Sequence, residues 1–195
     1  MKINPKEILL VPNLISLFRL VLFIPFLILF KLASEDWSYR NYIFATIIIA
    51  FISDLLDGFV ARKTNKISEM GKIIDPLADK VLMAIIVINL FIINKIPAYY
   101  FYIIISRDVI IFIGGILISR KLNKVLPSNL LGKLTVFSIG IFILAVLLNA
   151  DPVSNVYRIL LLLSLTMSFA SVIGYGIRAI EFIKKSNQSI DVTKN

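Results

Sequence analysis

Four aspartates at the adjoining ends of two apolar segments are the residues of this sequence best suited to chemistry. Asp54 and Asp57 are three residues apart, and Asp75 and Asp79 are four apart. If both segments are helices, each pair shares one face, because these spacings correspond to offsets of about 60° and 40° around the helix axis. Two such faces brought together would form an oxygen-lined cage for cations.

The composition limits which metals such a cage could bind. The sequence contains no cysteine and no histidine, which excludes thiol nucleophiles, imidazole bases and the usual zinc sites. Oxygen would therefore hold any metal, and magnesium, manganese and calcium are the candidates. Four facing carboxylates repel one another, so they need protons or cations to coexist. One or two divalent ions would meet that need, and a diphosphate would complete their coordination.

Residues around the aspartates suit a phosphorylated substrate. Asp79 could also accept the proton of an attacking hydroxyl group, with a basicity set by neighbouring anions and bound metal. Gly58 and Ala61 lie on about the same side of their segment as Asp54, where small side chains let a nucleotide or a helix approach closely. Arg62 follows, and its planar guanidinium group suits phosphate. Taken alone, Gly58 would be a helix-packing residue and Arg62 a membrane-surface anchor.

The segments that position these residues have the composition of membrane helices. Of the 195 residues 58% are hydrophobic, and the mean hydropathy is +0.90, so the chain has more apolar surface than one soluble core could hide. The net charge of +9 could suggest nucleic acid, but the sequence shows neither a basic helix face nor an aromatic-basic RNA motif. Its basic residues cluster at the ends of apolar runs, which favours anionic headgroups or a phosphorylated substrate.

We therefore predict an all-α integral membrane protein with six transmembrane helices and a short N-terminal interfacial segment. Residues 1–183 would form one membrane domain, and 184–195 a polar, mobile tail. The first helix carries Arg19 and lacks a small-residue cleavage site, so it is predicted to be retained. The predicted helices are 16–32 with a kink at Pro25, 42–61 after a polar loop at 31–39, 73–93, 97–119 interrupted by Ser106-Arg107-Asp108, 131–148 and 156–183.

The distribution of lysine and arginine predicts the orientation. With six helices, both termini and the second and fourth loops share one side, and that side carries most of the basic residues. The other side has only Lys31, Arg40, Lys95 and Arg158. Because short cytoplasmic loops carry the excess of positive charge, the termini and both aspartate pairs are predicted to be cytoplasmic, in the cell membrane.

Eight residues at fixed spacing form the central motif: Asp54, Asp57, Gly58, Ala61, Arg62, Gly71, Asp75 and Asp79. Their spacing resembles, without a departure, the signature of the CDP-alcohol phosphotransferase family (class I) of membrane enzymes. The resemblance implies that the four aspartates bind Mg²⁺ or Mn²⁺, as two ions, that Asp79 is also the general base, and that the enzyme is a homodimer. The residues assigned to the CDP-containing donor are Asn13, Gly58, Ala61, Arg62, Ser68 and Gly71.

The reaction that the resemblance implies is transfer of a phosphatidyl group from CDP-diacylglycerol to an acceptor hydroxyl, with release of CMP. Arg107, Lys133 and Arg178 lie near the predicted cytoplasmic halves or ends of their helices and could converge on an anionic acceptor. Each could equally be a snorkelling or dipole-pairing cation, and Arg107 could simply pair with Asp108. Three cations together favour a phosphorylated acceptor over serine, choline or ethanolamine.

The run Pro12-Asn13-Leu14-Ile15-Ser16-Leu17-Phe18-Arg19 resembles the start of bacterial phosphatidylglycerophosphate synthases, with Ser16 where threonine is frequent. The segments 106–108 and 127–135 resemble related branches as much as that one. The leading acceptor is sn-glycerol 3-phosphate. Inositol phosphate comes second, and phosphatidylglycerol, as in a cardiolipin synthase, third.

Two alternatives use the aspartates without this chemistry. A cation channel or transporter would line its path with them, but it leaves Gly58, Arg62 and Gly71 unexplained. It also predicts acidic residues deeper in the membrane. The second alternative is a non-catalytic lipid-binding module of the same fold. Metal-dependent release of CMP would distinguish an enzyme from such a module.

Overall fold

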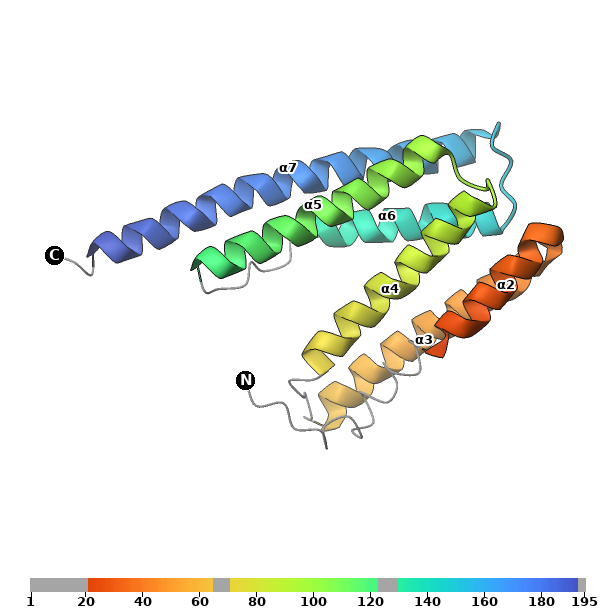
Figure 1. Cartoon of the computed structure of the whole chain (residues 1–195), viewed down its shortest axis with the longest axis horizontal. Helices are drawn as coiled ribbons and strands as arrows, with labels where there is room; N and C mark the ends of the chain where they lie inside the picture. Colours follow the sequence, from red (N-terminus) through yellow and green to blue (C-terminus); the bar gives the residue numbers. More distant parts are fainter. Residues whose placement is uncertain (1–20, 65–70, 123–129, 193–195) are drawn as a thin grey trace. The chain divides into compact units, whose positions relative to one another are not determined.

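The computed structural model describes residues 21–64, 71–122 and 130–192, without the side chains at 54, 57–64, 71–79, 119–122 and 185–192. The described part is helical and contains no β-strand, which confirms the predicted class. Each of the six predicted helices has a counterpart. In chain order the elements are α2 (Phe23–Glu35), the 3₁₀ helix η2 (Trp37–Tyr39), α3 (Arg40–Thr64), α4 (Gly71–Ile92), α5 (Ala98–Leu122), α6 (Leu130–Leu147) and α7 (Asn155–Val192) (Figure 1).

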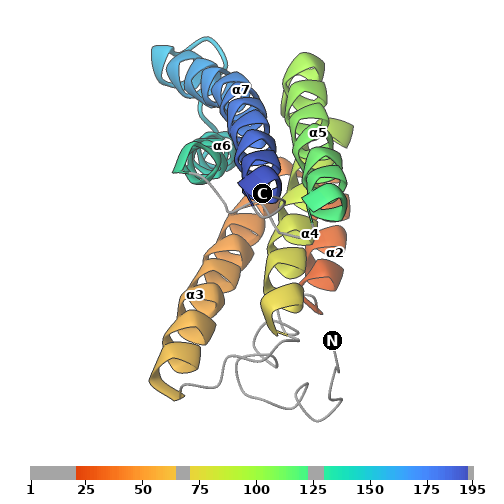
Figure 2. The ribbon, with the colours of Figure 1, turned by 90° about the vertical axis from the view of Figure 1, so that its left-hand side faces the viewer.

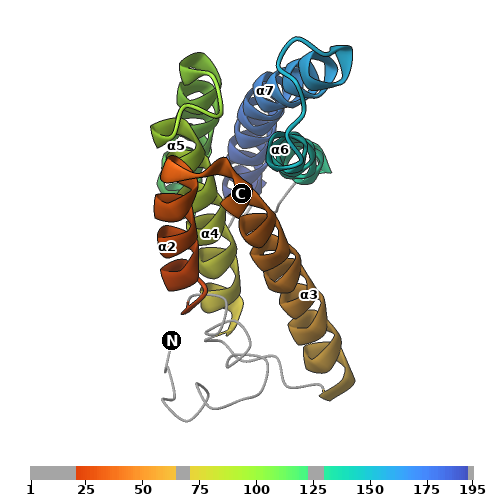
Figure 3. The ribbon, with the colours of Figure 1, turned by 90° about the vertical axis from the view of Figure 1, so that its right-hand side faces the viewer.

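The chain divides into two compact units, residues 1–96 and 97–195. In the first unit α2 packs against both α3 and α4 (Figure 3). Phe26 and Phe30 of α2 are buried, with ring centroids 6.5 Å apart. Ile43 of α3 and Leu90 of α4 are fully buried as well. One apolar face of α2 thus holds the two aspartate-bearing helices in a single unit.

In the second unit α7 packs against α5 and α6 (Figure 2). An aromatic cluster joins the three helices, since the Phe142 ring centroid lies 4.6 Å from that of Tyr100 and 5.1 Å from that of Tyr157. Gly115 of α5 leaves room for the Tyr175 hydroxyl, which lies 2.9 Å from where a Cβ atom at position 115 would stand. The glycine therefore allows the close approach of α5 to α7.

Three buried serines mark the face of α7 that turns to its neighbours. Ser164, Ser168 and Ser171 are spaced by four and three residues, so they share one side of the helix. Each hydroxyl donates to a carbonyl one turn earlier, at 2.9, 2.7 and 2.9 Å. Because these hydroxyls are satisfied within α7, small polar side chains can pack between helices at little cost.

α4 and α6 end in the same way, with an asparagine in the left-handed conformation. Asn94 has φ 56° and Asn149 has φ 63°. After α4, the N–H of Asn94 donates to the Phe91 carbonyl at 3.0 Å, and the N–H of Lys95 donates to the Leu90 carbonyl at 2.8 Å. This is a Schellman cap, which satisfies the last carbonyls and turns the chain sharply.

The structure corrects several predicted boundaries. The predicted loop at 31–39 is wrong, because α2 runs to Glu35 and η2 begins at Trp37. Asp36 lies between them; hydrogen bonds from Ser38 to its carboxylate cap η2 and lower the pKa of Asp36. The predicted kink at Pro25 stays a prediction; Leu22, three residues earlier, forms a turn, and Pro25 lies in the first turn of α2.

Two helices are longer or more regular than predicted. The predicted interruption at Ser106-Arg107-Asp108 is wrong, because α5 is continuous from Ala98 to Leu122. A buried arginine does not break a helix when its guanidinium group finds partners outside the backbone. α7 continues to Val192, where the sequence predicted an end at residue 183. The residues 184–192 are therefore helical rather than irregular.

Three helices within the described residues are long and apolar enough to cross a bilayer: Ala98–Ile118, Leu130–Leu147 and Asn155–Lys184. Lys80–Ile92 is a shorter apolar helix. Large exposed apolar side chains cover these helices, among them Phe112, Phe137 and Phe169. Such surfaces belong in lipid, so the chain is a membrane protein with several apolar helices.

Candidate active site

The aspartates lie on the two helices that the sequence predicted. Asp54 and Asp57 belong to the C-terminal part of α3, and Asp75 and Asp79 to the N-terminal part of α4. Residues 65–70 connect the two helices, so both pairs come at the same end of the first unit (Figure 1). Towards this end α3 and α4 diverge (Figures 2 and 3). The side chains of all four aspartates lie outside the described residues, so their meeting in one cage stays a prediction.

The predicted donor-binding residues surround the same connection. Gly58, Ala61 and Arg62 follow Asp54 along α3, and Gly71 is the first residue of α4. Asn13 and Ser68 lie outside the described residues. Most of the motif therefore lies on the two helix ends that residues 65–70 connect.

The donor set of this end fits a hard divalent cation. Among the side chains that the structure describes, no group of three or more acidic, cysteine or histidine residues is placed to hold a metal. The side chains of the four aspartates lie outside that set, and they offer carboxylate oxygen alone. Oxygen ligands of this kind suit Mg²⁺ and Mn²⁺.

Arg107 is buried in the second unit, with 8% of its surface exposed. Its Nε atom donates to the Ser171 hydroxyl of α7 at 3.0 Å, and its Nη1 atom forms an ion pair with the carboxylate of Asp108. A charge in an apolar interior needs such partners, because its desolvation costs several kcal/mol. The pairing with Asp108, one of the two alternatives raised by the sequence, is therefore present, and Arg107 also ties α5 to α7.

Lys133 and Arg178 are both exposed, on α6 and α7. Two residues after Lys133, the Thr135 hydroxyl donates to the Met167 carbonyl at 2.9 Å, one turn of α7 before Ser171. Lys133 and Arg107 therefore lie at neighbouring levels along α7. Arg178 comes seven residues after Ser171, roughly 10 Å farther along the helix.

Sequence reasoning missed the polar contacts that place these cations. Ser171 and Thr135 are buried and bridge helices that are far apart in the chain. The available signal was the serine spacing on α7, which marks one face of a helix in an otherwise apolar segment.

Comparisons with known proteins agree with the motif. A family described as CDP-alcohol phosphatidyltransferase matches residues 9–170. A CDP-diacylglycerol–glycerol-3-phosphate 3-phosphatidyltransferase of Aquifex aeolicus is 35% identical over 185 residues, which cover 90% of this chain and 98% of the relative. An enzyme of the same name from Bacillus subtilis is 34% identical over 152 residues, 72% of this chain and 78% of the relative. A rat cardiolipin synthase (CMP-forming) is 43% identical over 104 residues, 52% of this chain and 32% of the relative.

Proposed function

The chain belongs to the CDP-alcohol phosphatidyltransferase family, and from that membership we propose that it transfers a phosphatidyl group from CDP-diacylglycerol to sn-glycerol 3-phosphate, releasing CMP. The observation that carries the acceptor is the 35% identity to a glycerol-3-phosphate phosphatidyltransferase across 90% of this chain and 98% of the relative. The chain is thus a transferase of phospholipid biosynthesis.

In the proposed reaction, the acceptor hydroxyl oxygen bonds to the phosphorus that carries the diacylglycerol, and the bond from that phosphorus to CMP breaks. Asp79 accepts the hydroxyl proton. Asp54, Asp57 and Asp75 would hold two Mg²⁺ or Mn²⁺ ions together with Asp79. When bound, these ions neutralise the diphosphate and the charge that develops on CMP. The protein contributes mainly positioning and electrostatic stabilisation, and no covalent enzyme intermediate is needed.

The donor is placed by residues around the connection between α3 and α4. Small residues allow the nucleotide to approach the backbone, and Arg62 pairs with a phosphate. In this proposal all six helices span the membrane, the aspartates and both termini face the cytoplasm, and the chain forms a homodimer. The residues assigned to CDP are Asn13, Gly58, Ala61, Arg62, Ser68 and Gly71.

The cations of the second unit support a phosphorylated acceptor. Arg107 and Lys133 come at neighbouring levels of α7, and with Arg178 they would offset the charge of a phosphate dianion. Phosphatidylglycerol moves ahead of inositol phosphate, which the sequence ranked second, because the similarity to a cardiolipin synthase reaches 43% over about half of the chain.

The acceptor is tested with purified protein, CDP-diacylglycerol and Mn²⁺, offered sn-glycerol 3-phosphate, inositol 1-phosphate, serine or phosphatidylglycerol in separate reactions. We expect glycerol 3-phosphate to give the fastest release of CMP, because its phosphate can form charge-assisted hydrogen bonds with these cations that serine cannot form. A preference for serine would overturn the assignment, and a preference for phosphatidylglycerol would make the second candidate correct.

Lys133→Ala tests the acceptor site most cleanly, because Lys133 is exposed and its loss leaves no cavity. We expect the KM for glycerol 3-phosphate to rise about 30-fold, since a charge-assisted contact is worth ~2 kcal/mol, while the KM for CDP-diacylglycerol changes little. Arg107→Ala should raise the same KM and also lower Tm, because Arg107 is buried and bonded to Ser171.

The matched control is Arg158→Ala, which removes an exposed cation that the proposal places on the opposite membrane face. Its KM values should equal those of the parent protein. Equal increases for both substrates in Lys133→Ala would remove this lysine from the acceptor site.

A further inference from the structure

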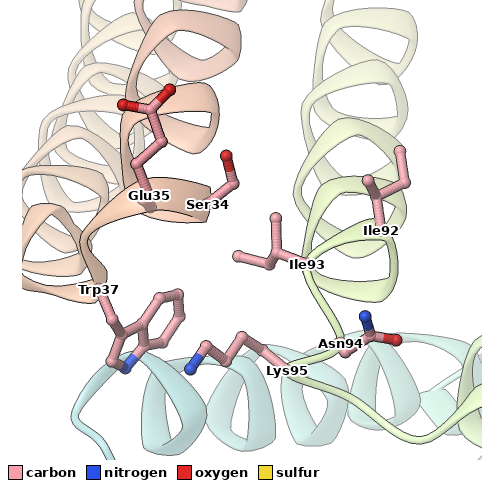
Figure 4. Close-up of a pocket in the computed structure, with 8 residues that line it drawn as sticks. Ser34, Glu35, Trp37, Ile92, Ile93, Asn94 and Lys95 are labelled. Atoms are coloured by element: carbon pink, nitrogen blue, oxygen red, sulfur yellow. The ribbon is translucent and has the colours of Figure 1, made fainter.

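The first unit has a second site, at the end opposite to the aspartates. A cavity of about 490 Å³ lies between the last residues of α2 and the last residues of α4, within the usual range of ligand pockets. α4 has 22 residues, so roughly 30 Å of helix separates this cavity from the aspartate-bearing end. The cavity is lined by Ala33, Ser34, Glu35, Trp37, Ile92, Ile93, Asn94 and Lys95 (Figure 4).

One side of the cavity presents a fixed cation. The Nζ atom of Lys95 lies 4.2 Å from the centroid of the Trp37 ring, a cation–π contact. The backbone of Lys95 is held by the Schellman cap, in which its N–H donates to the Leu90 carbonyl. Trp37 is held in turn because η2 is capped by Asp36. The ammonium group is therefore positioned before any ligand arrives.

Another side of the cavity presents an anion. Glu35 is the last residue of α2, and its side chain is exposed and, among the described residues, forms no ion pair. Figure 4 shows its carboxylate well away from the Lys95 ammonium group. A carboxylate at a helix C-terminus is unfavourable, because the helix dipole places partial negative charge there. The C-terminus of α4 lies at the same cavity and adds its own partial negative charge, so this side of the cavity attracts a cation.

The remaining walls are apolar. Ile92 is 64% exposed and Ile93 is half-buried beside it. Tryptophan and lysine at the end of membrane helices belong to the level of the lipid headgroups. A ligand that reaches this cavity from the bilayer would bring an apolar part for the isoleucines.

We propose that this cavity binds a lipid with a phosphoethanolamine headgroup. The phosphate pairs with Lys95, the primary ammonium group donates hydrogen bonds to Glu35, and the glycerol and acyl carbons pack on Ile92 and Ile93. An anionic headgroup such as phosphatidylglycerol has no cation to pair with Glu35, and its net negative charge is repelled by the carboxylate. A choline headgroup has a cation without N–H donors, so it cannot form the hydrogen bonds to the carboxylate.

The test uses the whole purified chain in a neutral detergent, titrated separately with phosphatidylethanolamine, phosphatidylglycerol, phosphatidylcholine and soluble phosphoethanolamine. Binding is measured by native mass spectrometry and by the shift in Tm. We expect phosphatidylethanolamine to bind most tightly and to raise Tm. Lys95→Gln and Glu35→Gln should each weaken its binding about 30-fold, the loss that corresponds to one charge-assisted hydrogen bond.

Lys95→Arg and Glu35→Asp keep the charges and should retain binding, and Arg158→Gln is the control for loss of an exposed cation elsewhere. CMP release should be unchanged in all five variants, so failure here is distinguishable from failure of the proposed enzyme. Equal binding of the three lipids, unchanged binding in Lys95→Gln and Glu35→Gln, or equal affinity for soluble phosphoethanolamine would overturn the proposal.

Discussion

Removal of divalent cations by a chelator is expected to abolish release of CMP, and excess Mg²⁺ or Mn²⁺ is expected to restore it. The four aspartates belong to the two helix ends that residues 65–70 connect, and in the proposed site their carboxylates would repel one another unless cations or protons neutralise them. The diphosphate of the donor adds further negative charge to the same place. Without metal, neither the donor nor the departing CMP would be neutralised, so the loss should be complete within the sensitivity of the assay.

Calcium is expected to substitute poorly. It accepts more ligands at longer distances than magnesium, so it would hold a diphosphate less tightly against the carboxylates. The assay follows CMP from CDP-diacylglycerol in detergent, with chelator alone and with each metal added back in excess. A second measurement is Tm, which should rise with Mg²⁺ or Mn²⁺ because bound metal relieves the repulsion. Full activity in chelator would refute the metal site.

The sequence predicted the helices well because their cause is local. Six predicted apolar helices each have a helical counterpart, and three of these counterparts are long and apolar enough to cross a bilayer within the described residues. The residues at which the helices end were less predictable. Polarity over 31–39 indicated a loop, but α2 ends only at Glu35 and η2 follows after one residue. Polar residues at a membrane surface are compatible with helix, so polarity alone does not locate a helix end.

The fourth predicted helix shows why tertiary contacts escape such reasoning. Arg107 in an apolar run predicted an interruption, but its guanidinium group bonds to Ser171, 64 residues later, and α5 continues. The cation–π contact of Lys95 with Trp37 likewise joins residues far apart in the chain. Hydrophobic periodicity predicts which face of a helix is buried, but it does not predict which residue of another helix that face contacts.

For the candidate site, the informative property was residue spacing. The aspartate pairs were assigned from offsets of three and four residues, and the structure confirms that each pair lies on one helix. That the two pairs meet in one site stays a prediction. The positions of Arg107, Lys133 and Arg178 were harder to predict, because nothing in the sequence tells where along the α7 axis each of them lies. Arg107 and Lys133 come within about one turn, whereas Arg178 is about two turns farther.

Asp79→Asn is expected to lower kcat by roughly 10²-fold or more, the usual scale for a general base, while folding and much of the donor binding are preserved. Asparagine has nearly the same shape and keeps an oxygen for the metal, but it cannot take the proton of the acceptor hydroxyl. Asp79 is one turn after Asp75 on α4, so both belong to one helix end and provide a matched comparison.

Asp75→Asn should differ from Asp79→Asn in which constant changes. Loss of a metal ligand weakens metal and donor binding, so the KM for CDP-diacylglycerol and the Mn²⁺ concentration at half-maximal activity should both rise. In Asp79→Asn, kcat should fall at saturating metal and donor, and Tm should stay close to that of the parent. The pH profile separates the roles further, since the acidic limb that reports the base should disappear only in Asp79→Asn. If this variant turned over at nearly the parent rate, Asp79 would be a metal ligand alone, and the proton would have to leave by another route.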